Sequence, residues 1–545
     1  MDKLQGKSVF GGIAIGKVCY FKPTRVEITD EEVADIDAEL SRFQEARENA
    51  IKQQNDLYEK ALAEAGEESA EVFSVHAMML EDDDLVEQIT AMIRDEHKNA
   101  KYAVERVCRS QAEVFYSMDD AYMKERGTDI IDIGKEMLFF LSGEAADANE
   151  LKEQIILVAE DLTPSDTVRL NKDLLLGFVT KKGSENSHTA ILARNMGIPA
   201  IVQCDEVSEA ADGQLAIIDG ENSTFYISPT EEILERYNEL KGEALKRRKA
   251  LEALKGVATE TIEGRRINLY ANIGSPNDLK QVFENDAEGI GLFRSEFVYL
   301  NSKDYPTEDA QFEAYKKVLE EMAPKKVIIR TCDIGADKTV DYMGLEPEEN
   351  PAMGLRAVRI SLSQVDLFKT QLKALLRASA CGNLGIMFPM ITSTWELKRC
   401  KELLEECKKE LDFEKKVYSS NIEIGTMIET PAAVFIADEL AKECDFFSIG
   451  TNDLTQYICA IDRQNPHLEA FTDTHHPAIL KAIEMTVKAA HDNDCWVGIC
   501  GELASDMELT EYFCRIGVDE LSVNAGMILP IREKIRTVNL TGKGF

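Results

Sequence analysis

The chain has 545 residues, with 99 Asp and Glu against 62 Lys and Arg, and a formal net charge of −37 at pH 7. This length predicts several domains, each with its own hydrophobic core. Such an acidic composition argues against nucleic acid and anionic membranes as partners and suits a basic protein partner. We find no apolar run as long as a membrane span and no pattern of a cleaved signal peptide. The twelve cysteines form no C-x-x-C pair, which is typical of a reducing compartment, so we expect a cytoplasmic protein.

Residues 1–23 predict one or two strands, after which the composition changes. Residues 24–145 are almost free of proline and rich in Glu, Ala, Lys, Leu and Met. Their apolar residues recur every three or four positions, as amphipathic helices require. We therefore expect a separate domain of several antiparallel helices over 24–145.

From about residue 146 the pattern switches to short apolar runs bounded by turn residues, which are typical of strands. Such runs occupy 154–159, 174–180 and 215–220. We predict that residues 146–228 join residues 1–23 in one α/β domain, into which the helical domain is inserted.

The charged segment 229–262 follows a capping box that starts at Ser228, and it predicts a linker helix. Residues 263–545 then alternate eight short apolar runs with longer amphipathic segments. An eight-stranded β/α barrel is the most economical fold for about 280 residues in this order. The expected strands are 268–273, 289–293, 327–332, 384–388, 423–428, 446–450, 496–500 and 520–523.

One stretch of the α/β domain stands out, Ser187-His188-Thr189-Ala190-Ile191-Leu192-Ala193-Arg194. Ser187 or Asn186 would cap a short helix, which places His188 in its first turn among unpaired backbone N–H groups. A phosphorylated imidazole would be stabilised there, because helix N-termini bind anions. A lone histidine is more often a capping or core residue, so the rest of the chain must decide between the two interpretations.

Polar residues cluster at the ends of the predicted barrel strands, where such barrels carry their active sites. Arg294, Arg330 and Arg463 can bind phosphate and carboxylate groups in bidentate fashion. Glu429 and Asp453 supply two hard oxygen ligands, a number that suits Mg2+. A salt bridge in the barrel mouth is the simpler interpretation of Glu429.

Two further polar residues follow predicted strands. Asn452 comes after the sixth strand, next to Asp453, and Cys500 ends the seventh. No base stands beside Cys500 in the sequence, so we do not expect a nucleophile, but a thiol can still donate a proton. A buried barrel cysteine explains the residue equally well.

Taken in order, several segments resemble Enzyme I of the phosphoenolpyruvate:sugar phosphotransferase system, and the resemblance runs almost end to end. It implies that His188 takes the phosphoryl group of phosphoenolpyruvate, releases pyruvate, and passes the group to the small carrier HPr to drive sugar uptake. The matching segments are 187–194, 289–297, 330–338, 349–351, 427–431, 448–457 and 500–502.

The resemblance also assigns residues and partners. The family's proton donor matches Cys500, and its Mg2+ ligands match Glu429 and Asp453. Family members bind HPr on the helical insert and dimerise through the barrel, so we expect a homodimer. The family's substrate-binding residues match Arg294, Arg330, Asn452, Asp453 and Arg463.

The sequence departs from the family pattern in three places. The family usually has two glycines and a basic residue before its phosphorylated histidine, whereas 183–186 here reads Gly-Ser-Glu-Asn. Glu185 should disfavour a phosphoryl group on His188 by like-charge repulsion. The Ser-Pro-Gly usual near the start is replaced by Phe-Gly-Gly at 10–12. The chain stops at Phe545, earlier than typical members, which leaves open whether the last barrel helix is present.

Other functions fit less well. A pyruvate-phosphate dikinase or phosphoenolpyruvate synthase would need a large ATP-binding domain where this chain has its helical insert. The nitrogen-regulatory paralogue would carry an N-terminal sensor domain, which we do not expect here. A regulatory protein that binds HPr without efficient turnover is motivated by the altered residues 183–186. A purely structural helical scaffold disagrees with the ordered polar residues at the strand ends.

Overall fold

The computed structural model of the protein describes residues 1–21, 26, 28–65, 67–118, 121–143, 153–162, 166, 172–183, 193, 197–335, 340–346 and 348–541. It divides into two compact units, Met1–Leu245 and Lys246–Phe545. Among the described residues, no helix combines the length and the apolar character needed to cross a membrane.

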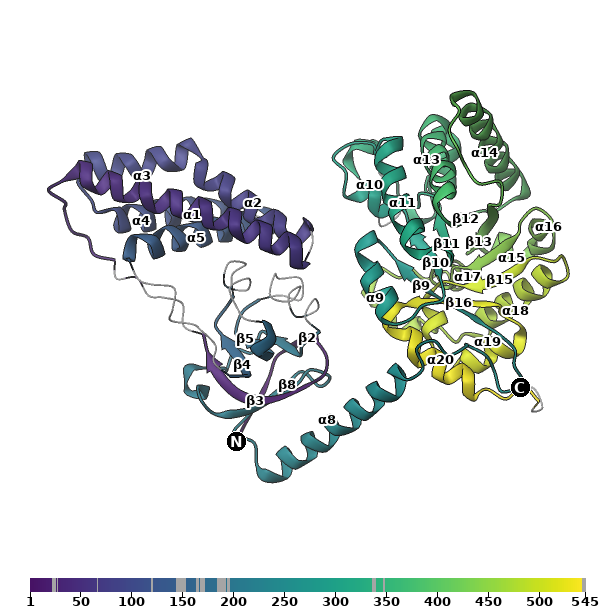
Figure 1. Ribbon diagram of the computed structural model, residues 1–545, viewed down its shortest axis with the longest axis horizontal. Coiled ribbons are helices and arrows are strands. Elements are labelled where there is room, and N and C mark those ends of the chain that lie inside the picture. The colour runs from purple at the N-terminus through teal and green to yellow at the C-terminus, as the bar shows by residue number, and fades with distance from the viewer. Residues whose placement is uncertain are drawn as a thin grey trace. The chain divides into compact units, whose positions relative to one another are not determined.

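The first unit contains an eight-stranded sheet whose strands come from both sides of the helical segment (Figure 1). The strands are β1 (Asp2–Gln5), β2 (Lys7–Phe10), β3 (Ile13–Tyr20), β4 (Ile155–Ala159), β5 (Leu175–Thr180), β6 (Ala200–Val202), β7 (Leu215–Asp219) and β8 (Thr224–Ile227). Their order is β1-β8-β7-β3-β4-β5-β6-β2, with β3 to β6 parallel and every other pairing antiparallel. Strand β4 is buried at every position, which explains its unbroken apolar sequence. The predicted α/β domain with a helical insertion is confirmed.

The helical segment packs around its own core. Its helices are α1 (Ile36–Ala65), α2 (Glu67–Glu81), α3 (Asp83–Asp95), α4 (Ala100–Tyr116) and α5 (Ala121–Ser142). Helix α3 buries Leu85, Ile89 and Ile93, the spacing of one helical face. Asp82 caps α3 by accepting a hydrogen bond from the Leu85 N–H at 3.0 Å.

Helix α8 (Glu231–Glu252) crosses the division between the two units. Its first half is fixed to the sheet, because the buried Tyr237 hydroxyl donates a 2.5 Å hydrogen bond to Asp219 Oδ2. Its second half is fixed to the barrel unit through Arg247, which pairs with Glu533 at 2.6 Å. The helix is therefore tied separately to each unit.

Eight parallel strands of the second unit close into a barrel, as predicted, with boundaries that differ by one or two residues at most. They are β9 (Asn268–Ile273), β10 (Ile290–Arg294), β11 (Lys326–Arg330), β12 (Asn383–Phe388), β13 (Glu423–Ile428), β14 (Phe446–Ile449), β15 (Trp496–Ile499) and β16 (Glu520–Asn524). The order β9 to β16 follows the chain, and β16 pairs with β9 to close the ring.

Helices cover the outside of this barrel. They are α9 (Leu279–Glu284), α10 (Glu296–Leu300), α11 (Glu308–Met322), α12 (Val358–Ser363), α13 (Val365–Ala378), α14 (Thr394–Glu414), α15 (Pro431–Phe435), α16 (Ala437–Ala441), α17 (Thr451–Cys459), α18 (Pro477–His491), α19 (Thr510–Ile516) and α20 (Ile528–Thr537). Helix α20 follows the last strand, β16.

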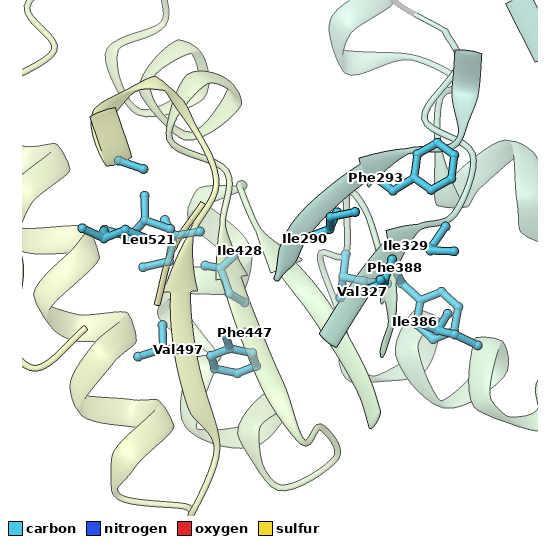
Figure 2. Packing of buried hydrophobic residues seen from close by; sticks show 14 of the residues in the cluster. Ile290, Phe293, Val327, Ile329, Ile386, Phe388, Ile428, Phe447, Val497 and Leu521 are labelled. Carbon is cyan, nitrogen blue, oxygen red and sulfur yellow. The ribbon is translucent and has the colours of Figure 1, made fainter. Parts of the chain in front are cut away.

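Alternation along the strands separates two layers of buried side chains. Val327 and Ile329 belong to the large cluster between strands and helices, part of which Figure 2 shows. Ile328, between them, belongs instead to a small cluster inside the barrel, together with Met427 and Cys500. Successive side chains of a strand point to opposite faces, so every second residue is directed inward. This alternation decides which strand-end residues reach the barrel mouth.

The interior of the barrel is closed at the starts of its strands. The rings of Phe446 and Trp496 stack with centroids 4.8 Å apart. Lys326 Nζ lies 5.4 Å from the centre of the Trp496 ring and pairs with Glu423, which also accepts a 3.0 Å hydrogen bond from Trp496. These side chains form a filled floor under the barrel, as expected for a packed core rather than a pore.

Arg532 of α20 ties the segment before the barrel to the barrel itself. It is fully buried, and its guanidinium pairs with Asp286 Oδ2 at 2.5 Å. The same group donates to the Leu254 carbonyl at 3.0 Å and to Thr259 Oγ1 at 3.0 Å. Arg532 therefore joins α20 to two other parts of the chain, the stretch 254–259 and the turn at Asp286.

We predict that Arg532→Ala destabilises the barrel unit by about 3 kcal/mol or more, because it removes a fully buried guanidinium and leaves the half-buried Asp286 carboxylate and two other acceptors without their donor. Both tryptophans of the chain, Trp395 and Trp496, lie in this unit, so urea unfolding followed by tryptophan fluorescence reports on it. Arg248→Ala is the control, since Arg248 and its partner Glu252 are largely exposed, and it should cost less than about 1 kcal/mol. Equal effects of the two substitutions would contradict this account.

Candidate active site

Arg330, the last residue of β11, is buried and held by two carboxylates. Its Nη1 pairs with Asp333 Oδ2 at 2.9 Å, and its Nη2 pairs with Glu296 at the start of α10. Arg330 lies two residues beyond Ile328, so the same alternation turns it into the barrel. The two carboxylates fix its guanidinium at the mouth, where Arg294 is its register partner on β10.

A second buried arginine, Arg356, completes this network, and the strand-end argument missed it. Its Nη2 lies 3.0 Å from Asp333 Oδ1, so Asp333 joins the two arginines. Its Nη1 lies 3.3 Å from Asp453 Oδ1 and 3.1 Å from the Tyr457 hydroxyl. Arg356 does not follow a strand, so the search of strand ends did not include it. It lies five residues after the segment 349–351, and a search around that segment could have found it.

Glu429, directly after β13, is buried with one oxygen satisfied. Oε1 accepts a 2.6 Å hydrogen bond from the Met390 N–H, whereas Oε2 has no hydrogen-bond partner among the described residues. Burial, reinforced by the negative charges of Asp453 and Asp333, raises the pKa of Glu429 to about 8. The site therefore contains a carboxyl that prefers to be neutral unless a cation joins it.

The neighbouring glycine shows how closely this carboxyl is enclosed. A Cβ on Gly450 would lie 2.9 Å from Glu429 Oε2, closer than real Cβ atoms come to an oxygen. Asp453 follows three residues later, in the first turn of α17. The charge of Asp453 acts on Glu429, so the two predicted metal ligands lie near each other.

Asn452 and Arg463, two predicted substrate-binding residues, have different surroundings. The Asn452 amide is held at both ends by Glu502, whose Oε1 accepts from Nδ2 at 3.0 Å and whose N–H donates to Oδ1 at 2.9 Å. Arg463 lies in the loop after α17 and lines a cavity of about 440 Å³. Asp453, Arg356 and Tyr457 line the same cavity, so Arg463 faces the buried network across it.

Cys500 follows β15 and is buried inside the barrel. Its Sγ lies 3.7 Å from the carbonyl oxygen of Ile449, to which the thiol can donate. Burial raises the pKa of Cys500 to about 12, although the neighbouring Ser448 hydroxyl and Arg330 oppose the rise. The residue is therefore a neutral thiol at pH 7, which argues against a nucleophile and leaves a proton to give.

Two predictions lie outside the described residues. His188, the predicted phosphoryl acceptor, and Glu185, the charge expected to disfavour its phosphorylation, both fall within residues 184–192. Their roles stay predictions from the sequence.

We predict that Glu429 makes the stability of the barrel unit pH-dependent when divalent cations are removed by a chelator. A glutamate in an unfolded chain titrates near pH ~4.3, whereas folded Glu429 keeps its proton to about pH 8. The folded state therefore binds more protons, and stability falls as the pH rises between these values. Glu429→Gln should reduce this fall, measured as the free energy of unfolding in urea at pH 5 to 8. An unchanged slope in the variant would show that Glu429 is ionised in the folded protein.

Comparison with known proteins places this geometry in a family. Three family models match in order: "PEP-utilising enzyme, N-terminal" over 5–126, "PEP-utilising enzyme, mobile domain" over 151–223, and "PEP-utilising enzyme, PEP-binding domain" over 248–540. The phosphoenolpyruvate-protein phosphotransferase of Priestia megaterium is 41% identical over 539 residues, 98% of this chain and 94% of that protein. The protein of the same name from Haemophilus influenzae is 41% identical over 532 residues, 97% of this chain and 92% of its own length.

Among solved structures, an NMR structure of an Enzyme I protein covers 44% of this chain and 99% of its own at 36% identity, with a TM-score of 0.39. The full-length relatives decide the assignment, since their similarity extends over both units. The chain belongs to the phosphoenolpyruvate-protein phosphotransferase family, and it is a phosphotransferase that uses phosphoenolpyruvate.

Proposed function

We propose that this enzyme transfers the phosphoryl group of phosphoenolpyruvate to its own His188 and then to the carrier HPr, releasing pyruvate and driving sugar uptake. One observation carries the proposal. At the barrel mouth, the Nε–H groups of Arg330 and Arg356 and one oxygen of Glu429 are buried without a hydrogen-bond partner among the described residues. Buried polar groups are normally paired, so these atoms are prepared for a ligand with anionic oxygens and a cation.

The substrate's negative charges would be shared among several residues of the mouth. Arg294, Arg330 and Arg463 supply cationic donors for its phosphate and carboxylate oxygens, and Asn452 and Asp453 complete the proposed set. Two features support this assignment: Arg463 lines the cavity of about 440 Å³, and Arg330 is fixed by Asp333. Fixed donors bind an anion without first losing side-chain freedom.

The donor set at the mouth fits Mg2+. Glu429 and Asp453 are two carboxylates close enough for the charge of one to raise the pKa of the other, and Glu429 has an oxygen to spare. Within the described ranges, no group of three or more His, Cys, Asp or Glu side chains is placed to hold a metal. Two protein ligands are typical for Mg2+, which completes its shell with water and substrate oxygens. When bound, it would offset charge on the phosphoryl and enolate oxygens.

The remaining chemistry is a proton transfer. Loss of the phosphoryl group leaves enolpyruvate, whose terminal carbon must gain a proton to give pyruvate. Cys500 is the proposed donor, which agrees with a thiol kept neutral by burial. Cys500 follows β15 on the same side as Trp496, which also belongs to the cluster inside the barrel, so the thiol lies inside the barrel at the carboxyl end of the strand.

The proposed docking site for HPr is a groove in the helical segment. Its volume is about 650 Å³, and its lining includes the apolar Met78, Met79, Leu85, Phe115 and Met123 and the acidic Asp82 and Asp84. Methionine side chains are flexible and suit a surface that must release its partner. The carboxylates would attract a basic face on the carrier.

Two further parts of the proposal concern assembly and location. We place the homodimer contact on the barrel unit, where Phe413, Phe435 and Phe471 are exposed, since large apolar side chains on a surface favour association. We place the protein in the cytoplasm, and support comes from the twelve cysteines, all of which are free thiols.

The first test is phosphoryl incorporation from [32P]phosphoenolpyruvate with Mg2+. Wild type should acquire acid-labile, alkali-stable label, and His188→Ala should lose it by about 100-fold or more, because the acceptor nitrogen is gone. Pyruvate release measured in the same samples should fall in parallel. Label that survives the substitution would exclude His188 as the acceptor. A folded wild-type protein that binds Mg2+ and takes no label would favour the regulatory interpretation.

A second prediction tests the groove. Met78 is 59% exposed and lines the groove, whereas Val114 is 57% exposed and does not line it. Met78→Asp should weaken HPr binding, measured by calorimetry, by about tenfold or more, because a charge replaces an exposed apolar side chain of the groove. Val114→Asp controls for the added charge and should change the affinity less than about twofold. Equal losses in both variants would place HPr elsewhere.

A further inference from the structure

Glu520, the first residue of β16, is a buried acid that the proposed reaction has not used. It is 1% exposed, and its Oε1 has no hydrogen-bond partner among the described residues. An unpaired buried carboxylate is costly, so burial raises the pKa of Glu520 well above its usual range and the group keeps its proton. The barrel therefore contains a neutral acid with an available oxygen.

Two glycines shape the space that this carboxyl occupies. A Cβ on Gly498 of β15 would lie 1.9 Å from Glu520 Oε2, and a Cβ on Gly291 of β10 would lie 2.4 Å from Oε1. Both distances are far too short for any side chain, so only glycine permits the carboxyl to lie there. The position of the Glu520 carboxyl therefore depends on β10, β15 and β16 together.

This position lies beside Cys500. Gly498 and Cys500 are two residues apart on the same strand path, so their side-chain positions share one face and are separated by roughly 7 Å. Because the Glu520 carboxyl fills the side-chain position of Gly498, it lies on the same face of the strand as the thiol, and Glu520 is among the groups that raise the pKa of Cys500. Ser448 is the register partner of Gly498 on β14, and its buried hydroxyl oxygen has no hydrogen bond of ordinary geometry to a described residue. The buried polar groups of Glu520, Ser448 and Cys500 therefore lie in the same part of the barrel interior.

We propose that Glu520 supplies the proton that restores the Cys500 thiol after each turnover. The inference rests on the proposed role of Cys500 as proton donor. Glu520 would act through Cys500 and would not touch the substrate.

The transfers balance as follows. The Cys500 S–H bond breaks as a C–H bond forms at the terminal carbon of enolpyruvate, which leaves a thiolate. The Glu520 O–H proton then passes to sulfur through one water molecule near Ser448, and solvent returns a proton to the carboxylate. The proton gained by carbon is matched by the one that the phosphorylated imidazole releases, so no external acid is consumed.

The direction of this transfer follows from the two environments. Burial raises the pKa of Cys500 to about 12, so its thiolate is a strong base that takes a proton from a carboxylic acid. Arg330 and Glu429 also act on the pKa of Cys500, and Glu520 contributes to the raised pKa of Tyr270 on β9. Glu429 cannot replace Glu520 as the donor in the working enzyme, because its proposed role is to hold Mg2+ as a carboxylate.

The test follows two labels through the full-length enzyme in D2O with Mg2+, phosphoenolpyruvate and [14C]pyruvate. The transfer of 14C from pyruvate to phosphoenolpyruvate measures the number of turnovers. Deuterium in the methyl group of the released pyruvate shows whether the thiol exchanged its proton with solvent between turnovers. Wild type should place solvent deuterium in pyruvate at nearly every turnover. In Glu520→Gln, the thiol should return the hydrogen it took from the previous pyruvate, so deuterium per carbon exchanged should fall about tenfold. Glu520→Asp keeps an acid and should restore much of the ratio.

The control is Glu423→Gln, which makes the same change at another barrel carboxyl, one bonded to Lys326 and Trp496. Its ratio of deuterium to carbon should equal that of wild type. A wild-type ratio in Glu520→Gln, or a loss of both labels in proportion, would assign Glu520 a packing role and overturn the inference. Failure of the underlying function looks different: wild type would show no carbon exchange, or Cys500→Ala would keep both labels.

Discussion

Asp333 holds the active site together, because it is the carboxylate that two buried arginines share. One of its oxygens pairs with Arg330 and the other with Arg356, and Arg356 reaches on to Asp453. Buried charges persist only where partners compensate the loss of water, so removal of any member would leave others uncompensated. Through this chain of ion pairs, the end of β11 and the start of α17 are held in one arrangement. The positions of the candidate substrate and metal residues depend on that arrangement.

The barrel shows two ways of burying an acid. Asp333 and Glu296 are buried and form ion pairs with Arg330. Glu429 and Glu520 are buried with an oxygen unpaired, and their pKa values are raised accordingly. The first kind of acid fixes donors in place, whereas the second kind keeps a proton or accepts a cation. The chemistry of the mouth and the interior follows from this difference in partners, since all four are carboxyl groups in the same barrel.

The barrel strands could be predicted from the sequence because strands buried on both faces are continuous apolar runs, as in β11 and β14. Strand ends then locate Arg330, Glu429 and Cys500, since alternation determines which of them face inward. Arg356 could not be found in this way, because its partners lie 23 and 97 residues from it in the chain and the loop path alone brings them together. Glu520 was missed for the opposite reason: it starts a strand, and no pattern marks a carboxyl whose space is made by glycines on two other strands.

The filled floor of the barrel has a consequence for the order of events. The stacked rings of Phe446 and Trp496, with Lys326 and Glu423 beside them, block passage at the strand starts. In the proposed cycle, phosphoenolpyruvate would therefore enter and pyruvate would leave at the opposite end, where Arg330, Glu429 and Cys500 lie. The same proposal has the His188 imidazole react with phosphoenolpyruvate at that end. Under that proposal, escape of pyruvate would follow the departure of the phosphorylated His188, and a substitution that slows this departure would also lengthen the stay of pyruvate.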